Sequence, residues 1–172
     1  MNAIVYTTNT GHTKAYAELL GQKTGLPVLE LKEASKKLPP NAQVIYMGWL
    51  MAGTVKGYSK AAQHFSIQAV CGVGMAAVGS QVADIYKTNG ICAEIPVFCL
   101  QGGFEMEKLR GIYKLMMKTM RATAGKKLSE KTDRTPEEDE MLRLLMHGGN
   151  CVSAENLREV VTWYSSDILN KE

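Results

Sequence analysis

Five short apolar runs, each bounded by Gly, Pro or Asn, alternate along the chain with segments long enough to form helices. The runs are residues 3–7, 27–31, 43–48, 69–75 and 95–100. Their near-continuous hydrophobicity is typical of parallel strands that are buried on both faces. Between them, residues 12–24 carry apolar side chains at helical spacing and end at Gly25, and residues 57–66 and 79–89 are shorter helical candidates. This alternation predicts an α/β fold with a doubly wound, five-stranded parallel sheet covered by helices on both faces.

The length and composition of the chain narrow its class further. With 172 residues, of which 45% are hydrophobic, the chain suits one domain over residues 1–172. It has no apolar stretch of about 18 residues and no signal-peptide pattern, so we expect a soluble, cytoplasmic protein. Its cysteines form no CxxC pair and have no histidine at ligand spacing, so we expect no metal site. Cys71, Cys92 and Cys99 lie in or beside apolar runs and are expected to be small buried hydrophobes.

The stretch VYTTNTGHTK, residues 5–14, joins the first predicted strand to the first predicted helix. In a doubly wound fold, ligands bind beyond the carboxyl ends of the strands, and the unpaired N–H groups at a helix N-terminus favour an anion. The hydroxyls of Thr8, Thr10 and Thr13 add donors, whereas the GxxxxGK[ST] pattern needed for nucleotide hydrolysis is absent. We therefore predict a phosphate held mostly by neutral hydrogen bonds. The alternative is that the threonines only cap the helix and turn the chain.

This loop resembles the phosphate loop of the flavodoxin family, in which a hydroxyl-x-Thr-Gly-x-Thr pattern follows the first strand. The matching residues are Thr8, Thr10, Gly11 and Thr13, with Asn9 and His12 at the variable positions. The resemblance implies that the loop binds the monophosphate of FMN, and that the five strands lie in the order 2-1-3-4-5. It also implies that two further loops contact the isoalloxazine ring.

Two segments stand where the resemblance implies ring-binding loops. The first follows the third run and contains Trp49, Leu50, Met51, Ala52 and Gly53. An indole and glycines there can supply a flat apolar wall and a close backbone approach, although a tryptophan at this position can also be a core residue. The second segment follows the fourth run and contains Met75, Ala76 and Ala77. Flavodoxins usually place a ring-stacking tyrosine in this second segment, and this sequence has none.

Residues 101–152 form a predicted helical insertion between the fifth strand and the last helix. Apolar residues recur at helical spacing in its first half, at Leu109, Ile112, Met116 and Met120. Further on, Thr135-Pro136-Glu137-Glu138 predicts the capping box of another helix. Residues 104–134 hold nine Lys or Arg against four Asp or Glu, an excess of five positive charges. A basic amphipathic helix suits an anionic membrane surface or an acidic partner; alternatively, its apolar face covers the domain's own core.

The insertion is similar to that of the menaquinone-dependent protoporphyrinogen oxidases, flavodoxin-fold enzymes with a basic insertion after the fifth strand. The segment that carries this likeness is GIYKLMMKTMRATAGKKLSEKTDRT, residues 111–135. The resemblance implies FMN as the cofactor, protoporphyrinogen or a related compound as the substrate and a quinone as the acceptor. It also implies peripheral contact with the inner face of a membrane through residues 104–134. The alternative function is that of an electron carrier between redox proteins, and a third is a scaffold that has lost its flavin.

Other function classes lack the residues that they need. A response-regulator receiver requires acidic residues at the ends of its first and third strands, where Thr7, Thr8 and Trp49 stand. A serine hydrolase requires GxSxG, and Gly79-Ser80 has no second glycine two places on. No motif that reads nucleic acid is present, so no nucleic-acid partner is expected. Because no side chain is singled out as a catalytic acid, base or nucleophile, the chemistry is expected to belong to the cofactor.

Overall fold

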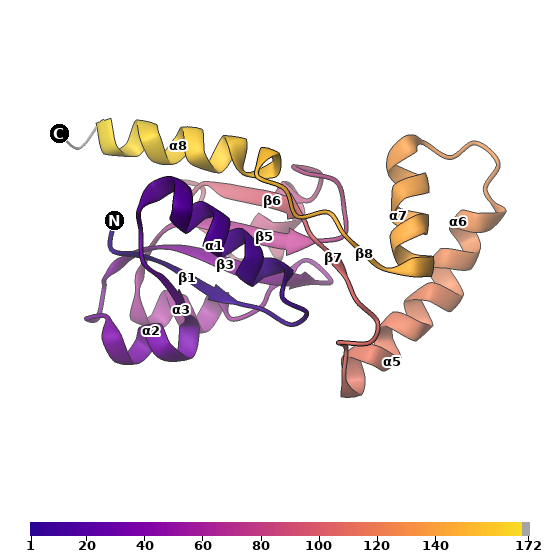
Figure 1. Ribbon diagram of the computed structural model, residues 1–172, viewed down its shortest axis with the longest axis horizontal. Coiled ribbons are helices and arrows are strands. Elements are labelled where there is room, and N and C mark those ends of the chain that lie inside the picture. Colours follow the sequence, from indigo (N-terminus) through magenta and orange to yellow (C-terminus); the bar gives the residue numbers. More distant parts are fainter. Residues whose placement is uncertain (170–172) are drawn as a thin grey trace.

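An open sheet of six strands forms the centre of the computed structural model, which describes residues 1–169 (Figure 1). The strands are β1 Ala3–Thr7, β2 Val28–Glu30, β3 Gln43–Met51, β4 Thr54–Val55, β5 Ser66–Gly74 and β6 Val97–Gln101. They lie in the order β2-β1-β3-β5-β6, and β4 pairs with β3. All pairs along this order are parallel, whereas β4 is antiparallel to β3. The predicted α/β class with an open parallel sheet is confirmed.

The strand count and order differ from the predicted five strands in the order 2-1-3-4-5. The chain does not enter a loop at residue 48 but continues β3 to Met51, turns at residues 52–53 and returns as β4. This extra hairpin strand shifts the numbering of every later strand. The chain still passes from β1 to β2 on one side and then to β3 on the other, so the winding reverses between β1 and β3. Such a reversal opens a crevice at the carboxyl ends of the two strands.

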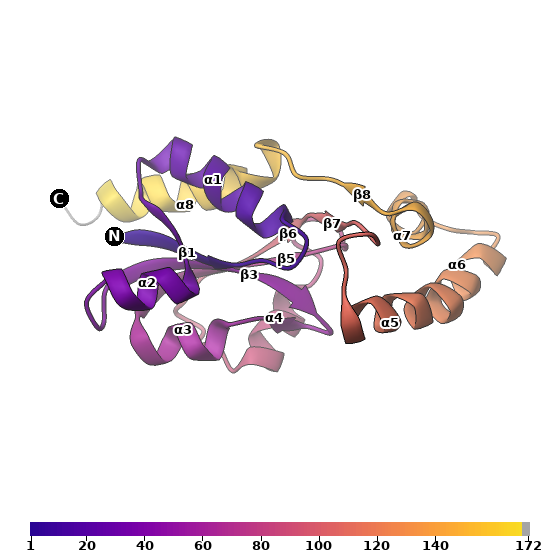
Figure 2. The ribbon, with the colours of Figure 1, turned by 60° about the horizontal axis from the view of Figure 1, so that its bottom comes forward.

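Helices cover both faces of the sheet (Figure 2). One face carries α1 His12–Thr24 and α8 Arg158–Leu169, the second preceded by a 3₁₀ turn at Glu155–Leu157. The other face carries α2 Leu31–Lys37, α3 Tyr58–His64 and α4 Val82–Asn89. Successive side chains of β1 point to opposite faces, so Ala3 and Val5 pack towards α2 and α3 while Ile4 and Tyr6 pack towards α1. The predicted burial of the strands on both faces is therefore confirmed for β1.

The end of α1 is fixed by two glycines. Gly25 adopts φ 72° and its N–H donates to the Gly21 carbonyl at 2.9 Å, which closes the helix. A Cβ at position 21 would lie 2.5 Å from a methyl group of Val28 on the neighbouring strand, so the position requires glycine. This close approach lets α1 lie directly against the edge of the sheet.

Residues between β6 and α8 form a helical lobe that projects from the sheet (Figure 1). Its elements are β7 Gly103–Phe104, α5 Gly111–Met120, a π-helical turn Arg121–Gly125, α6 Lys126–Glu130, α7 Pro136–His147 and β8 Gly149–Asn150. The short antiparallel ladder of β7 and β8 forms the neck of the lobe. The predicted capping box starts α7: Glu138 N–H donates to Thr135 Oγ1 at 3.3 Å, and Thr135 N–H donates to a Glu138 carboxylate oxygen at 3.0 Å.

The root of the neck is hydrogen-bonded to the α/β part. Tyr16 on α1 donates its hydroxyl to the Gln101 carbonyl at 2.5 Å. The Asn156 amide donates to Tyr16 Oη at 2.7 Å and to the Cys151 carbonyl at 3.0 Å. The two chain segments that connect the α/β part to the lobe are therefore both held where they meet the α/β part.

The apolar face of α5 points to solvent and does not cover the core. Ile112 and Leu115 are 66% and 64% exposed, and Met116 and Met120 are 43% and 37% exposed, whereas Leu109 just before the helix is buried. Of the two interpretations of this amphipathic segment, burial against the domain's own core is wrong for the helix itself. We call these four exposed residues the α5 apolar face.

The cysteines follow the prediction only in part. Cys71 and Cys99 are buried in the sheet, and burial raises the pKa of both thiols. Cys92 is exposed, because its apolar run lies in the turn before β6 and not in a strand. None of the described helices is long and apolar enough to cross a membrane.

Candidate functional site

Three loops meet at one edge of the sheet because β1, β3 and β5 are adjacent and parallel. Thr7 at the end of β1 pairs with Gly48, and Gly48 in turn pairs with Gly72 of β5. The chain segments that follow these positions are residues 8–13, 49–54 and 75–81. All three predicted binding segments therefore lie at the carboxyl edge where the winding of the sheet reverses, as a doubly wound fold requires of a ligand site.

The first loop leaves the N-terminus of α1 open to a ligand. Gly11 is the N-cap residue with φ 100°, so the cap has no side chain to accept from the first N–H groups of the helix. Gly11 donates its own N–H to Thr8 Oγ1 at 3.1 Å, which curls the loop back on itself. Thr8, Asn9 and Thr10 are half-buried. Because unpaired N–H groups and the helix dipole favour negative charge, this loop is suited to an anion.

His12 orients one hydroxyl of this loop. Its Nδ1 lies 2.9 Å from Thr10 Oγ1, and the side chain is only 6% exposed. Burial lowers the pKa of His12, while the nearby Glu105 carboxylate opposes this shift and Lys108 reinforces it. Thr13, one residue on, is buried as well. A ligand in this loop would thus meet hydroxyls, N–H groups and a largely neutral imidazole.

The second segment is a tight hairpin rather than the expected loop. Ala52 and Gly53 both have positive φ, 48° and 77°, which is the conformation of a two-residue type I′ turn. Asn89 of α4 donates its amide to the Gly53 carbonyl at 2.9 Å and accepts from Val55 N–H at 2.9 Å. The hairpin tip is thereby fixed to α4. Met51, which pairs with Thr54, is half-buried.

Leu50 and Trp49 point to opposite sides of β3, so they have different roles. Leu50 packs over Gly72 and Gly74 of β5: a Cβ on these glycines would lie 3.0 Å and 3.1 Å from its methyl groups. Leu50 therefore belongs to the core rather than to a ligand wall. Trp49 is half-buried at the carboxyl edge, and its carbonyl accepts from Lys56 N–H at 3.0 Å. Of the two, Trp49 remains the candidate for contact with a ligand.

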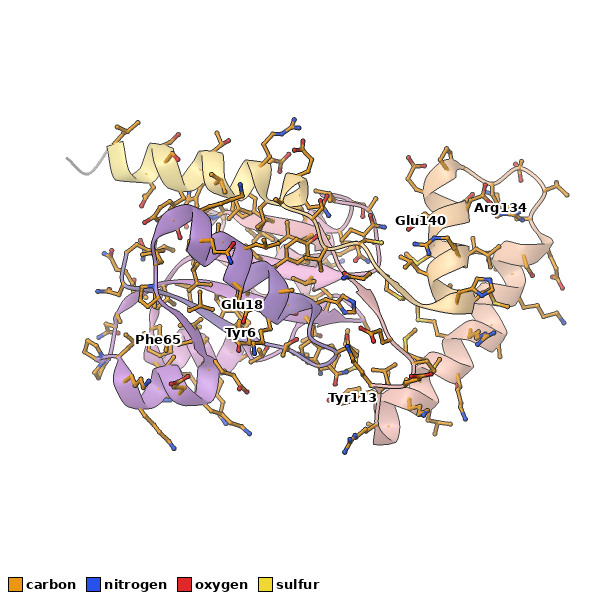
Figure 3. The ribbon with its side chains drawn as sticks, viewed as in Figure 1. Tyr6, Glu18, Phe65, Tyr113, Arg134 and Glu140 are labelled. Carbon is orange, nitrogen blue, oxygen red and sulfur yellow. The ribbon has the colours of Figure 1, made fainter. Side chains whose placement is uncertain are left out.

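Tyr113 of the lobe contacts Trp49, a pairing that the sequence does not predict. The two rings meet edge to face with centroids 5.1 Å apart, and the Lys56 ammonium lies 5.9 Å from the indole centroid. Figure 3 shows Tyr113 at the end of α5 that is nearer to the sheet. Since 64 residues separate the two rings in sequence, no local pattern could link them. The lobe thus contributes a second aromatic ring beside the candidate site.

The third segment is irregular and half-buried over Met75, Ala76 and Ala77. The side-chain amide of Gln101 donates to the Met75 carbonyl at 3.3 Å, and the Ser80 hydroxyl donates to the Ala77 carbonyl at 2.7 Å. Both bonds are accepted by carbonyl groups of this segment, so neither uses the backbone N–H groups of residues 75 and 76. Ala76 and Ala77 have small side chains, and the three residues supply no aromatic surface.

A hydrogen-bond cluster lies at the end of β1, next to the candidate site. Thr7 and Tyr46 both donate their hydroxyls to the Lys56 carbonyl, each at 2.6 Å. Burial raises the pKa of Tyr46 to about 12, so this hydroxyl remains protonated at neutral pH. Gly57 closes the cluster with φ 85°, and a Cβ there would overlap the Tyr46 hydroxyl. The end of β1 and the segment after β4 are therefore held together beside residues 8–13.

Two shallow hollows lie away from these loops. One of about 600 Å³ borders α4 and is lined by Ala83, Tyr86, Lys87, Ile91 and Ala93. The other, of about 500 Å³, lies within the lobe. Within residues 1–169 no three His, Cys, Asp or Glu side chains come together as a metal site would require.

Comparison with known proteins gives no family for this chain. No protein-family model matches it, and no curated protein matches it in sequence. Any function must therefore be argued from the fold and from the residues at the carboxyl edge of the sheet.

Proposed function

We propose that the protein is a flavodoxin-like FMN-binding oxidoreductase. The observation that carries this proposal is the meeting of residues 8–13, 49–54 and 75–77 at the point where the sheet's winding reverses, with the uncapped start of α1 among them. An anion site beside a half-buried indole suits a ligand with a phosphate at one end and a flat ring at the other.

The phosphate of FMN would be held by the first N–H groups of α1 and by the hydroxyls of Thr8, Thr10 and Thr13. Neutral donors fit a bound anion because they avoid the desolvation cost of burying a positive charge. Thr10 is already oriented by His12 at 2.9 Å. The backbone N–H of Asn9 would complete the cradle, while Gly11 N–H curls the loop by its bond to Thr8 Oγ1.

The ring of FMN would lie between Trp49 and the backbone of residues 75–77. Ala52 and Gly53, whose positive φ makes the hairpin tip a tight turn, would lie at the edge of the ring. When bound, FMN supplies transfer of a hydride or of single electrons, and the protein sets its orientation and access. The protein's own part is to hold the ring and to admit the reaction partner, since no side chain of the three segments serves as a catalytic acid or base.

The lobe favours an enzyme over a plain electron carrier. Through Tyr113 it reaches Trp49, and its segment 104–134 carries the excess of five positive charges. An acidic substrate such as protoporphyrinogen, or one related to it, would meet Lys and Arg favourably. A quinone would then be the acceptor. The second candidate is an electron carrier, which would be reduced by a flavoprotein reductase and reoxidised by diverse acceptors; a flavin-free scaffold is the third.

The α5 apolar face supports contact with the inner face of an anionic membrane. Four large apolar side chains are exposed on one helix, and Lys114, Lys118 and Arg121 lie on the same segment. Apolar burial combined with attraction to anionic headgroups is how amphipathic helices bind bilayers. Sedimentation with vesicles containing phosphatidylglycerol should recover the protein, less so at high salt. The double variant Ile112→Gln/Leu115→Gln should lose this binding, while Leu169→Gln, an equally polar change on exposed α8, should keep it.

The flavin proposal is tested by titrating FMN and riboflavin into the purified protein and following flavin fluorescence. Riboflavin lacks the phosphate, so FMN should bind more tightly to the wild type. Thr10→Val and Thr13→Val should each weaken FMN binding by roughly tenfold, because each removes a hydrogen bond to a charged group. Riboflavin binding should change little, and Thr162→Val on α8 should behave as the wild type.

Equal affinity for FMN and riboflavin would contradict the proposed phosphate site. Absence of any flavin binding would favour the scaffold. If FMN binds, reduction by a flavoprotein reductase with rapid reoxidation by unrelated acceptors would favour the electron carrier. Oxidation of protoporphyrinogen with menaquinone as the acceptor would favour the enzyme.

A further inference from the structure

A basic groove runs along the side of the lobe where the π-helical turn joins α5 to α6. It is an open hollow of about 500 Å³. Its apolar lining comes from Met106 before α5, Ala122 in the π-helical turn and Met146 on α7. Gly125 forms part of the floor, where a Cβ would lie 3.7 Å from the Met146 sulfur. Residues from three segments of the lobe thus line the apolar part of this groove.

Three cations line this groove and no carboxylate does. Lys118, Arg121 and Lys126 are among its lining residues, with Ser129 as the remaining polar one. Among the described residues, Lys126 has only a loose ion pair with Glu130 at 3.9 Å, and no ion pair is found for Lys118 or Arg121. Two other cations of the lobe are paired: Lys131 has a Glu138 oxygen at 2.7 Å, and Arg134 has an Asp139 oxygen at 2.6 Å. The groove therefore carries positive charge that the protein itself does not neutralise.

The π-helical turn places these groups on one side of the helix. Lys118 near the end of α5 and Arg121 at the start of the π-helical turn are three residues apart and therefore neighbours on the helix surface. The wider π-helical turn over Arg121–Gly125 then keeps Ala122, Gly125 and Lys126 on the same side as Arg121. Single π-helical turns within helices are frequent at functional sites. The α5 apolar face does not contribute to the groove, since none of its four residues lines it.

We propose that this groove binds a small amphipathic acid, with a single apolar chain and one carboxylate. The apolar chain of the ligand would lie on Met106, Ala122 and Met146. The carboxylate would accept from the Arg121 guanidinium, whose planar fork matches a carboxylate, and from the Lys118 ammonium. A second copy of this basic lobe would bring like charges together and does not fit. The site goes beyond the proposed flavin function and does not depend on it.

The test is isothermal titration calorimetry of the full chain at low salt, with octanoate below its micelle concentration. Octanoate should bind once per chain. Lys118→Gln/Arg121→Gln should weaken binding by roughly tenfold or more, because charge-assisted hydrogen bonds are lost. The matched control Lys114→Gln/Lys127→Gln removes the same charge from the same segment outside the groove and should bind as the wild type does. Ala122→Trp leaves all charges in place, fills the groove and should abolish binding.

Two further ligands separate the parts of the proposal. Octanol has the chain without the charge, and inorganic phosphate has charge without the chain; both should bind at least tenfold more weakly than octanoate. Octanol or phosphate binding as tightly as octanoate would overturn the proposal. So would equal weakening in the groove variant and the matched control, or unchanged binding in Ala122→Trp with a native circular dichroism spectrum.

Discussion

At the scale of single residues, the candidate site depends on side chains whose roles are set by burial. His12 is the clearest case. It lies inside the protein with Nδ1 against Thr10, and the groups that act on it are Glu105 and Lys108 from the segment after the neck and the Gly149 backbone. A buried imidazole that is kept neutral orients a hydroxyl without adding a charge to the loop at residues 8–13.

The lowered pKa of His12 predicts a loss of stability in mild acid. Below its ordinary value of 6.5, the imidazole of the unfolded chain takes up a proton that the folded chain binds less readily. The unfolded state therefore gains protons first, and the free energy of unfolding falls as the pH drops through and below that value. Urea denaturation between pH 7.5 and pH 5 should show this fall in the wild type and a smaller one in His12→Gln. His64→Gln, which removes an exposed imidazole, serves as the control, and an unchanged slope in His12→Gln would contradict the assignment.

Gly57 is predicted to tolerate no side chain. It has φ 85°, and a Cβ would overlap the Tyr46 hydroxyl in the hydrogen-bond cluster beside residues 8–13. Gly57→Ala should cost about 3 kcal/mol or more, from backbone strain together with overpacking. Gly90→Ala is the matched control, since Gly90 has φ 59° but open space around it, and it should cost only about 1 kcal/mol. Similar losses in the two variants, measured by chemical denaturation, would show that the clash is not the cause.

At the scale of elements, segments with a clear apolar pattern or cap signal could be predicted from the sequence, including the short α3 and α4, whereas α2 and the β3–β4 hairpin could not. The helix at residues 12–24 and the capping box at Thr135 were predicted correctly, because apolar spacing and cap residues are local signals. The β3–β4 hairpin was missed because its turn residues, Ala52-Gly53, lack the Asn or Asp that usually marks such a turn. The seven-residue α2 was missed as well, since it directly follows β2 without a cap signal.

The sequence could predict which three segments meet at the carboxyl edge of the sheet, but not the contacts around them. The three segments follow from the strand order alone, so sequence could locate them. Three features depend on packing between segments that are distant in sequence. These are the core position of Leu50, the hydrogen bond from Asn89 to the hairpin and the contact of Tyr113 with Trp49. The exposure of the α5 apolar face could not be decided from its spacing, since an amphipathic helix has the same pattern whether its apolar face covers a core or meets a partner.

The capping box of α7 predicts a measurable contribution to the stability of the lobe. Thr135→Ala removes the acceptor of the Glu138 N–H and should lower the free energy of unfolding of the lobe by about 1 kcal/mol. Thr135→Ser keeps a hydroxyl and should retain most of the stability. Amide hydrogen exchange of α7 is the suitable readout, because it reports local opening of this helix. Equal protection in Thr135→Ala and the wild type would show that the cap contributes nothing.

At the scale of the whole molecule, an α/β part and a projecting lobe are joined by a neck of two short strands. The neck offers a place at which the lobe can be replaced by a short turn, because Phe104 and Gly149 are paired across β7 and β8. Replacing residues 105–148 by a two-residue Asn-Gly turn should leave a folded α/β domain that still binds FMN. This variant should lose vesicle binding and octanoate binding, and its Trp49 emission should shift to the red because Tyr113 no longer contacts the indole. A variant that unfolds would show that the lobe is needed for the fold.

The central claim is that three loops at one edge of the sheet form one FMN site. The most direct measurement is an NMR titration of the ¹⁵N-labelled protein with FMN, followed at the backbone amides. We expect the largest shift changes at residues 8–13, 49–54 and 75–77, with the amides at the start of α1 responding to FMN and not to riboflavin. Shift changes confined to the basic lobe, or no response at the first loop, would contradict the claim.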